Sequence, residues 1–520
     1  MHITRLLCML ALLFVLGCRQ TPDTQPQVQH DITTPIRSDD ERIKRLAPFI
    51  PLADSIIMRY ANESHIPGLA YGIVLDGKLI HARFSGISNL KENTPVYTNT
   101  TFRIASMTKS FTTMAILILR DQGLLSLDDP ASKYIPDMKG IKYLTTDAPG
   151  ITVRDLMTHR AGFPEDNPYG DRQLSDTEQE LMDLIKQGPS FSNVPGIRYE
   201  YSNLGVSLLG TIIKNITNQP YQKFIADNIF KPLGMEHTYW EFSNVPARDL
   251  AHGYRWINND FKEEELLHDG AWGGMGGLLT TIDDFSKYMN LHLAAWPPRD
   301  GEDDGPLKRS SIREMHQLWN LNSVGAGFTY PTGRLCPTVS GYGFGLRIAK
   351  DCENRVSIGH GGGLPGFGSH WLIMPDYGLG IAIFSNRTYA NWGGINLQIM
   401  DTLIALAGMK PHQVKSKILE QRKQELMQLL PEWKDAEKLH IFAENFFPDY
   451  PIDSLRKEAR SLFEKAGPVK NVSAMNPLNN LRGSFDIEGE KARLRVFFTL
   501  SPEPDPKIQE YHISELRSDQ

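Results

Sequence analysis

Several common functional signatures are missing from the sequence. There is no His-Glu-x-x-His or other metal-ligand spacing, so we expect no metal and no organic cofactor. There is no Gly-x-Ser-x-Gly elbow, which disfavours an α/β-hydrolase. An excess of positive charge is also missing, because the net charge is −6 and the pI is near 6.2. With no basic patch among aromatic residues, nucleic-acid binding is not expected.

Long apolar runs are equally scarce. Beyond the N-terminus no stretch is long and apolar enough to cross a membrane, and no internal repeat occurs. What the chain has instead is a globular composition, with 41% hydrophobic and 22% charged residues. Its 8 Trp, 18 Tyr and 23 Phe can fill a sizeable core. At 520 residues the chain is longer than one ordinary domain.

The N-terminus has the features of an export signal. An apolar run over residues 6–16 follows a basic residue and is too short to span a bilayer. It ends in Leu16-Gly17-Cys18, which resembles a bacterial lipobox. We therefore expect residues 1–17 to be a signal peptide and Cys18 to carry lipid; an ordinary signal peptide with an incidental cysteine is the alternative. Residues 18–40 are expected to form a disordered tether. The expected location is the bacterial cell envelope, membrane-anchored and facing the periplasm or the exterior.

Export bears on the remaining cysteines. Apart from Cys18, the chain after the signal peptide contains only Cys336 and Cys352, and an exported protein meets an oxidising compartment. A disulfide between them is favoured. Two free thiols are the alternative, because the sequence does not give the distance between the two Cα atoms.

The first strands are expected just after an amphipathic helix over residues 41–63. The runs 69–75 and 78–84 have strand character. Asp76-Gly77 between them is the strongest short signal for a two-residue hairpin turn. The sequence therefore predicts a β-hairpin at this point.

Helices and long loops dominate residues 124–289, and strand character then returns. The further expected strands are 342–349, 355–358, 369–374 and 379–385. Strands at both ends with a helical middle indicate an α+β fold, in which one antiparallel sheet is flanked by helices and holds an inserted helical lobe. We assign residues 41–408 to this domain, and a functional site is expected in the cleft between sheet and lobe.

Residues 409–520 have a different character. Charged helical segments are expected over 410–430 and 435–467, followed by strands at 481–487, 492–500 and 508–513. This pattern indicates a helical linker and a small α+β domain. The segment holds no concentration of catalytic residue types, so an accessory or docking role is expected, with no partner identified.

The chemistry is expected around Ser106-Met-Thr-Lys109, at the start of an apolar helix. Residues three apart share a helix face, so the hydroxyl and the amine can meet. A serine needs a base to become a nucleophile, and a lysine is that base only when burial or a cation lowers its pKa from about 10.4. The Ser-x-x-Lys pattern alone is weak, because Ser88-Asn-Leu-Lys91 also matches it within a loop signal.

Two further segments accompany this serine. Tyr201-Ser202-Asn203 lies at a turn entering an apolar helix, and Asn203 is also suited to cap that helix. His360-Gly361-Gly362-Gly363 follows a strand, which is expected to end in these glycines and to let a substrate approach the backbone. A half-buried tyrosine and a plain glycine turn are the structural alternatives.

In this order, Ser106-x-x-Lys109, Tyr201-x-Asn203 and His360-x-Gly362 resemble the serine β-lactamase and penicillin-binding-protein superfamily. The likeness is to the class C branch, with its D-Ala-D-Ala carboxypeptidase and esterase relatives, and covers about residues 45–400. It implies a β-lactamase-like fold with Ser106 as the acylated nucleophile.

The resemblance also implies roles for the other residues of the motifs. Lys109 and Tyr201 would share the proton transfers, and Asn203 would hold the substrate. The backbone N–H groups of Ser106 and Gly363 would form the oxyanion hole, with Gly361 and Gly362 beside the substrate.

One position departs from the β-lactamase pattern. His360, which is expected to be the fourth catalytic residue, stands where β-lactamases usually have lysine, and a histidine of ordinary pKa, about 6.5, is mostly neutral at pH 7. Lys109 is then expected to be the one strong cation near Tyr201. This departure favours esterase, amidase or peptidase activity over efficient β-lactam hydrolysis.

The function implied is therefore a cell-envelope serine hydrolase acting through a Ser106 acyl-enzyme. Its substrate would be an ester or an amide or peptide, as in an esterase or D-amino-acid peptidase. The alternatives are a penicillin-binding sensor or weak β-lactamase that acylates but turns over slowly, and a catalytically silent envelope scaffold. The sequence does not distinguish between ester, D-amino-acid peptide and β-lactam substrates.

Overall fold

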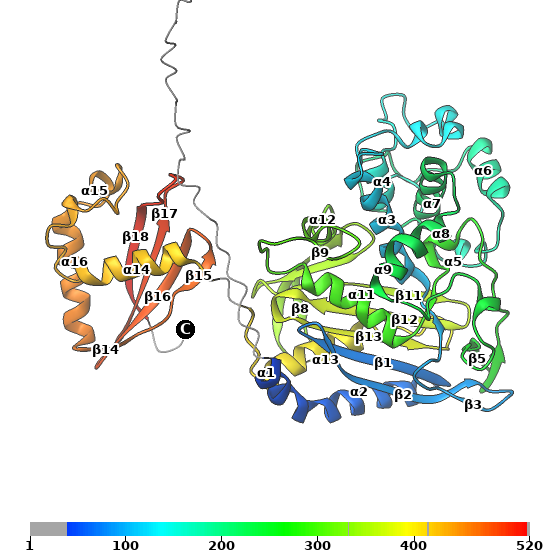
Figure 1. Cartoon of the computed structure of the whole chain (residues 1–520), viewed down its shortest axis with the longest axis horizontal. Helices are drawn as coiled ribbons and strands as arrows, with labels where there is room; N and C mark the ends of the chain where they lie inside the picture. Colours follow the sequence, from blue (N-terminus) through cyan, green and yellow to red (C-terminus); the bar gives the residue numbers. More distant parts are fainter. Residues whose placement is uncertain (1–38, 331, 413–414, 517–520) are drawn as a thin grey trace, which may run out of the picture. The chain divides into compact units, whose positions relative to one another are not determined.

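The computed structural model describes residues 39–330, 332–412 and 415–516 (Figure 1). These residues divide into two compact units, with the division after Val414. The expected signal peptide, the lipidated Cys18 and nearly all of the expected tether lie outside the described residues. Among the described residues, no helix is both long and apolar enough to cross a bilayer.

The larger unit is built on a nine-stranded antiparallel sheet with strand order β3-β2-β1-β13-β12-β11-β10-β9-β8. The first and last strands of the unit's sequence, β1 to β3 and β13, meet within this sheet, where β1 pairs with β13. The strands are β1 (Gly68–Leu75), β2 (Lys78–Asn89), β3 (Thr94–Pro95), β8 (Asn320–Thr329), β9 (Leu335–Tyr342), β10 (Arg347–Asp351), β11 (Val356–Leu364), β12 (Phe367–Met374) and β13 (Leu379–Ser385).

Helices cover both faces of this sheet, which makes three layers (Figure 1). Along β1, Leu69 and Tyr71 pack on one side with α2 (Ile50–Glu63) and α13 (Gly393–Leu406), while Ala70 and Val74 face the core of the other side. Because both of its faces are buried, β1 is apolar along its whole length instead of alternating.

The second face carries the helical lobe and the long helix α3 (Lys109–Asp121), which is buried at every position from Lys109 to Leu119. The other helices on this side are α4 (Val153–Met157), α5 (Asn167–Gly170), α6 (Glu178–Gln187), α7 (Asn203–Thr217), α8 (Tyr221–Ile225), α9 (Lys231–Leu233), α10 (Gly273–Gly276), α11 (Ile282–Ala294) and α12 (Arg309–Met315). Two small ribbons accompany them, β4 (Phe102–Arg103) with β7 (Leu279–Thr280) and β5 (Tyr254–Ile257) with β6 (Asp260–Glu263).

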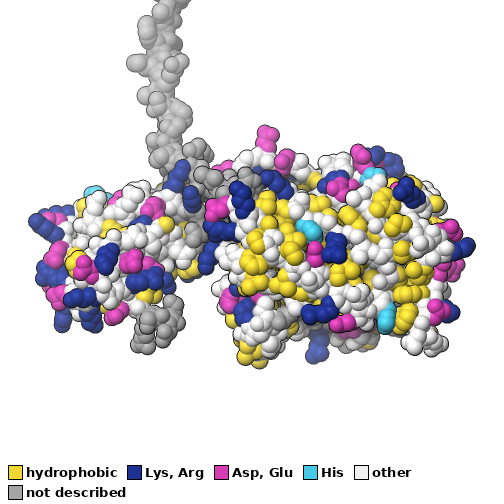
Figure 2. Space-filling model, turned by 90° about the horizontal axis from the view of Figure 1, so that it is seen from below, with side chains coloured by type: hydrophobic (Ala, Val, Ile, Leu, Met, Phe, Trp, Pro, Cys, Tyr) yellow, Lys and Arg dark blue, Asp and Glu magenta, His cyan; other side chains and the backbone are white. Residues whose placement is uncertain are grey.

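The helices α2 and α13 form a single layer on the first face of the sheet. Figure 2 shows hydrophobic side chains on the face of the larger unit on which α2 lies, with charged side chains among them. Leu52 of α2 and Leu406 of α13 are exposed hydrophobic residues of this helical layer. Before α2 the chain forms α1 (Asp39–Leu46) and a short 3-10 turn, so the helix predicted over 41–63 is interrupted.

The predicted hairpin is confirmed. Asp76 and Gly77 both have positive φ, +49° and +84°, as a two-residue type I′ turn requires. The predicted strand over 342–349 is wrong, because the chain turns after Tyr342 and resumes as β10 at Arg347. Gly345 makes this turn with φ +68°, and a Cβ at this position would lie 2.7 Å from the Lys109 carbonyl oxygen. The turn therefore packs against the start of α3.

The strand predicted over 355–358 is longer in the structure, because β11 continues through the glycines 361–363, in which it was expected to end, and stops at Leu364. Further along the sheet, Cys336 and Cys352 form a disulfide with their Cα atoms 5.6 Å apart. The structure thus selects the favoured alternative for these two cysteines.

The smaller unit, described from Lys415 to Leu516, has its own core and a sheet of five strands. Its strands are β14 (Val469–Val472), β15 (Asn476–Asn479), β16 (Arg482–Gly489), β17 (Arg493–Leu500) and β18 (Ile508–Leu516). Its helices are α14 (Lys417–Leu429), α15 (Phe446–Asp449) and α16 (Ile452–Ala466). The three predicted strands correspond to β16, β17 and β18, and the α+β fold class is confirmed for the chain.

Candidate active site

Ser106 lies in a 3-10 turn, Ala105–Thr108, which leads directly into α3. Ala105 before it has φ +52°, a left-handed conformation that is uncommon for a residue other than glycine and is often found at functional sites. The turn brings the Oγ of Ser106 to 3.0 Å from the Nζ of Lys109. The structure therefore brings the predicted hydroxyl and amine into contact.

Lys109 is fully buried, and burial is the main cause that lowers its pKa from 10.5 to about 7. Its Nζ lies 2.7 Å from the Oδ1 of Asn203 and 2.7 Å from the Met275 carbonyl oxygen. Both oxygens can only accept hydrogen bonds, so a neutral amine gives its two N–H groups to them. Its lone pair is then left for the Ser106 hydroxyl, as a general base requires.

Tyr201 lies on the other side of this amine. The Nζ of Lys109 is 5.0 Å from the centre of its ring, and the ring is 6% exposed. Burial raises the pKa of Tyr201 well above its usual value, although the interaction with Ser106 lowers it in part. The phenol is therefore protonated at neutral pH and suited to donate a proton.

Asn203 is the first residue of α7, and its side chain is fully buried. Ser202 caps the helix, since its Oγ accepts a hydrogen bond from the N–H of Gly205 at 3.1 Å. The sequence-based choice of Asn203 as the cap is therefore wrong by one residue. The Asn203 amide instead bonds Lys109 and the Asn167 carbonyl oxygen, at 2.7 and 3.3 Å. Here it orients the lysine, and its contact with a substrate stays a prediction.

His360 borders the site but is only 2% exposed. Its Nε2 lies 2.9 Å from the Oη of Tyr342. Burial and the charges of Arg347 and Lys109 hold the pKa of His360 well below its usual value. The imidazole is therefore neutral across the physiological range, and not only mostly neutral as an ordinary histidine would be.

The glycines after His360 have different surroundings. A Cβ on Gly362 would lie 2.2 Å from the Ile104 carbonyl oxygen, so this position must be glycine for β11 to pass the Ser106 turn. A Cβ on Gly361 would meet the His370 ring at 3.4 Å, and one on Gly363 would meet the Tyr389 ring at 2.9 Å. Gly362 therefore serves the packing of the site as well as access to it.

Arg347 is the residue that the sequence analysis missed. It is on β10 beside Gly359, its side chain is exposed to the pocket, and its guanidinium carbon lies 5.5 Å from the centre of the Tyr201 ring. In the described part of the chain no carboxylate pairs with it. The expectation of a single strong cation beside Tyr201 is therefore wrong. The only signal was a lone arginine inside what looked like one continuous strand.

These side chains share one open cavity of about 460 Å³. The residues that line it are Ser106, Asn167, Tyr201, Arg347, His360, Gly361, Gly362, Gly363, Ser369, His370, Tyr389, Ala390, Asn391 and Gly393. A nucleophile with a buried base, a phenol and a guanidinium cation thus lie around one cavity, and the arrangement can support acyl transfer. The described residues contain no cluster of ligands that could hold a metal ion.

His159 packs behind Tyr201 and Ser202 and supports the site. Its Nδ1 accepts a hydrogen bond from the N–H of Ser202 at 3.1 Å, and its ring packs 4.4 Å from that of Tyr201. Burial keeps its pKa well below the usual value, so the ring stays neutral.

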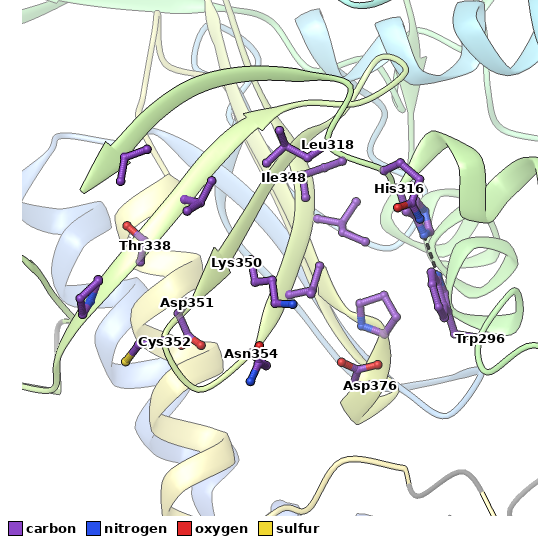
Figure 3. Close-up of a pocket in the computed structure, with 17 residues that line it drawn as sticks. Trp296, His316, Leu318, Thr338, Ile348, Lys350, Asp351, Cys352, Asn354 and Asp376 are labelled. Atoms are coloured by element: carbon purple, nitrogen blue, oxygen red, sulfur yellow. Dashed lines mark hydrogen bonds between the residues drawn. The ribbon is translucent and has the colours of Figure 1, made fainter. Parts of the chain in front are cut away.

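A larger cavity of about 690 Å³ lies over β8–β11 (Figure 3). Its wall is mainly apolar, with Leu318 and Ile348 on the sheet side and Trp296 opposite, where the Nε1–H of Trp296 donates to the Nδ1 of His316. None of the residues lining the Ser106 cavity borders it. Size alone therefore does not mark the candidate active site.

Sequence comparison places the chain among known proteins. A family model described as beta-lactamase matches residues 53–403. Protein flp of Staphylococcus aureus (strain MW2) is 30% identical over 338 residues, which are 64% of this chain and 62% of that protein. Beta-lactamase-like protein 2 of Dictyostelium discoideum is 32% identical over 248 residues, 46% of this chain and 45% of that protein. The chain thus spans less than two thirds of the length of these curated relatives.

Two solved structures share the fold. The octameric penicillin-binding protein homologue from Pyrococcus abyssi has a TM-score of 0.57 at 21% identity, covering 89% of this chain and 99% of that one. A class C beta-lactamase mutant has a TM-score of 0.54 at 20% identity, covering 71% of this chain and 100% of that one.

The chain therefore belongs to the beta-lactamase family. This family lies within the serine β-lactamase and penicillin-binding-protein superfamily, whose members are generally serine hydrolases. The resemblance and the β-lactamase-like fold predicted from the sequence are confirmed. The catalytic roles of the individual residues stay predictions.

Proposed function

We propose that this protein is a serine hydrolase that forms an acyl-enzyme on Ser106, with esters or peptides ending in a D-amino acid as substrates. The observation that carries the proposal is the 3.0 Å contact between the Ser106 hydroxyl and a buried Lys109 whose pKa is lowered to about 7. A lysine in this state is a base at neutral pH without any further partner.

In the first step, neutral Lys109 takes the proton of Ser106 while Oγ attacks the carbonyl carbon of the substrate. The oxygen of that carbonyl becomes an oxyanion, for which the backbone N–H groups of Ser106 and Gly363 are the proposed donors. Such a donor typically lowers the activation free energy by about 3–4 kcal/mol.

In the second step the tetrahedral intermediate collapses. The bond to the leaving group breaks as Tyr201 gives it a proton, and Tyr201 regains a proton from the Lys109 ammonium. The acyl-enzyme remains, with Lys109 neutral again. Water then repeats the sequence on the acyl-enzyme, with Lys109 as base and Ser106 as leaving group, and releases the acid.

Arg347 supports the peptidase part of the proposal. Its guanidinium is a permanent cation beside Tyr201, on the side where a leaving group would receive its proton. A leaving group that carries a carboxylate, such as a C-terminal amino acid, can bind there in a charge-assisted hydrogen bond. A neutral ester can react at the same centre without this contact.

The decisive test is covalent labelling with a fluorophosphonate and with a penicillin, followed by mass mapping. Label is expected on Ser106, and Ser106→Ala is expected to lose both labelling and hydrolysis. Ser88→Ala is the matched control, since Ser88 belongs to the second Ser-x-x-Lys match but donates its hydroxyl to the Thr94 carbonyl oxygen at 3.1 Å. Label on Ser88, or turnover by Ser106→Ala, would refute the assignment.

The same experiment separates the alternatives. Steady turnover supports the hydrolase, and one equivalent of acylation without turnover supports the penicillin-binding sensor. No adduct with either reagent supports the silent scaffold. We further propose that lipid on Cys18 anchors the protein in the cell envelope and that the smaller unit has an accessory role.

A further inference from the structure

The candidate active site has two ends along β11. His360 lies at one end, beside Arg347, which pairs with Gly359 across the sheet. Gly363 lies at the other end, three residues after His360, which corresponds to about 10 Å along the strand at the usual rise per residue. Ser106 faces the middle, because the backbone just before its turn abuts Gly362.

This geometry separates the two parts of a substrate. The groups proposed to hold and protonate a leaving group, Arg347 and Tyr201, lie at the His360 end. The acyl part of a substrate must therefore extend from Ser106 toward Gly363. What stands at that end limits the acyl group.

Tyr389 stands there. It follows β13, and its N–H donates to the Phe367 carbonyl oxygen at 3.0 Å, at the hairpin where β11 turns into β12. Its ring borders the cavity and lies against Gly363, where even an added Cβ would come within 2.9 Å of it. Its hydroxyl donates to the Oδ2 of Asp171 at 2.9 Å.

Asp171 belongs to the opposite wall. It directly follows α5, whose first residue Asn167 also lines the cavity. The Asp171 residue is 1% exposed, and its Oδ1 is buried without a hydrogen-bond partner among the described residues. The carboxylate is thus fixed in the wall and turned toward Tyr389, so the tyrosine spans the cavity from the sheet to the lobe.

The backbone of Tyr389 is consistent with a functional role. Its φ is +54°, a conformation that costs a non-glycine residue free energy, and its side chain is 44% exposed. A strained and half-exposed aromatic residue contributes little to a core. Among the described residues, the one hydrogen bond of its side chain is that to Asp171.

We propose that Tyr389, held by Asp171, closes the acyl end of the pocket and restricts the enzyme to substrates with short acyl groups. The inference rests on the proposed function and adds a substrate class to it. Tyr389 is a specificity-determining residue in this reading, and Asp171 is a positioning residue that acts through it.

The test compares p-nitrophenyl acetate, butanoate and octanoate on the full chain. Wild type is expected to lose kcat/KM steeply from acetate to octanoate. Tyr389→Ala is expected to raise the octanoate-to-acetate ratio of kcat/KM at least tenfold, mainly through KM for octanoate. Tyr389→Phe keeps the ring but loses the hydrogen bond to Asp171, so it should raise the octanoate-to-acetate ratio by a smaller factor than Tyr389→Ala. Asp171→Asn should raise the ratio by a similarly small factor. Tyr389→Trp should lower the ratio.

Tyr97→Ala is the matched control, since Tyr97 also donates its hydroxyl to a carboxylate, that of Asp249, but does not border the pocket. Its ratio should stay that of wild type. Fluorophosphonate labelling of Ser106 is measured on every variant. If Tyr389→Ala does not fold, Tyr389→Phe and Tyr389→Trp still test the inference. Labelled Ser106 with an unchanged ratio in all Tyr389 variants overturns this inference alone, whereas an unlabelled wild type overturns the proposed function.

Discussion

Replacing Arg347 with glutamine is the sharpest test of how the site binds a substrate. The change removes the one cation exposed in the pocket and keeps a polar side chain of similar length. A neutral ester does not use the cation, whereas a peptide with a terminal carboxylate does. The two substrate classes should therefore respond differently.

The size of the effect follows from the geometry. A hydrogen bond between charged groups contributes about 1.5–3 kcal/mol. At about 1.4 kcal/mol for each factor of ten, Arg347→Gln should lower kcat/KM for a carboxylate-bearing peptide about 10- to 150-fold. For a neutral ester the loss should be small. Because the Arg347 charge helps to lower the pKa of Lys109, the midpoint of the ester pH profile should move upward from about 7.

The assay is kcat/KM for both substrates between pH 5 and 9. Since His360 is neutral throughout and Arg347 is always charged, binding of the carboxylate should not weaken as the pH rises through 6–7, as a histidine of ordinary pKa would require. Lys350→Gln is the matched control, as Lys350 is an exposed cation of the same strand that borders the other cavity. Equal losses for both substrates would refute the assignment of Arg347.

Four further outcomes are expected. The kcat/KM of wild type for a neutral ester should rise with pH through about 7 and then level off, because Lys109 acts as a base only when deprotonated; a flat profile would contradict this. Cys18→Ser should yield a soluble, unlipidated protein in cell fractionation and mass spectrometry. Reducing the Cys336–Cys352 disulfide should lower the free energy of unfolding by about 3 kcal/mol in denaturant titrations. Truncation after His412 should leave phosphonate labelling of Ser106 intact. Loss of labelling in a truncated protein that still folds would show that the smaller unit contributes to the active site.

Local sequence signals predicted the elements that short-range chemistry controls. The hairpin at Asp76-Gly77 follows from two residues that tolerate positive φ, and the contact between Ser106 and Lys109 follows from helical spacing. The order of the motifs along the chain was enough to predict the family and hence the fold. Each of these signals involves residues close together in the sequence or a known order of motifs, so it can be found without the structure.

The misassigned elements depend on contacts between distant segments. The turn at Gly345 exists because β10 must pass the start of α3, and β11 extends through Gly362 because its register with β12 holds it in the sheet. Arg347 reaches Tyr201 only through this strand pairing. His412 is a similar case, since its Nε2 lies 3.0 Å from buried Asp76, which is far from it in the sequence.

The state of Lys109 shows why the site needs the whole fold. Burial alone would lower the pKa of the amine but leave its lone pair without a direction. Two oxygens from different segments, of Asn203 at the start of α7 and of Met275 in α10, take its N–H groups and turn the lone pair toward Ser106. Nearby carboxylates such as Asp171 oppose the burial by raising the pKa of Lys109, so the value settles near 7 and not lower. A hydrolase active at neutral pH needs this balance, and no single motif of the sequence contains it.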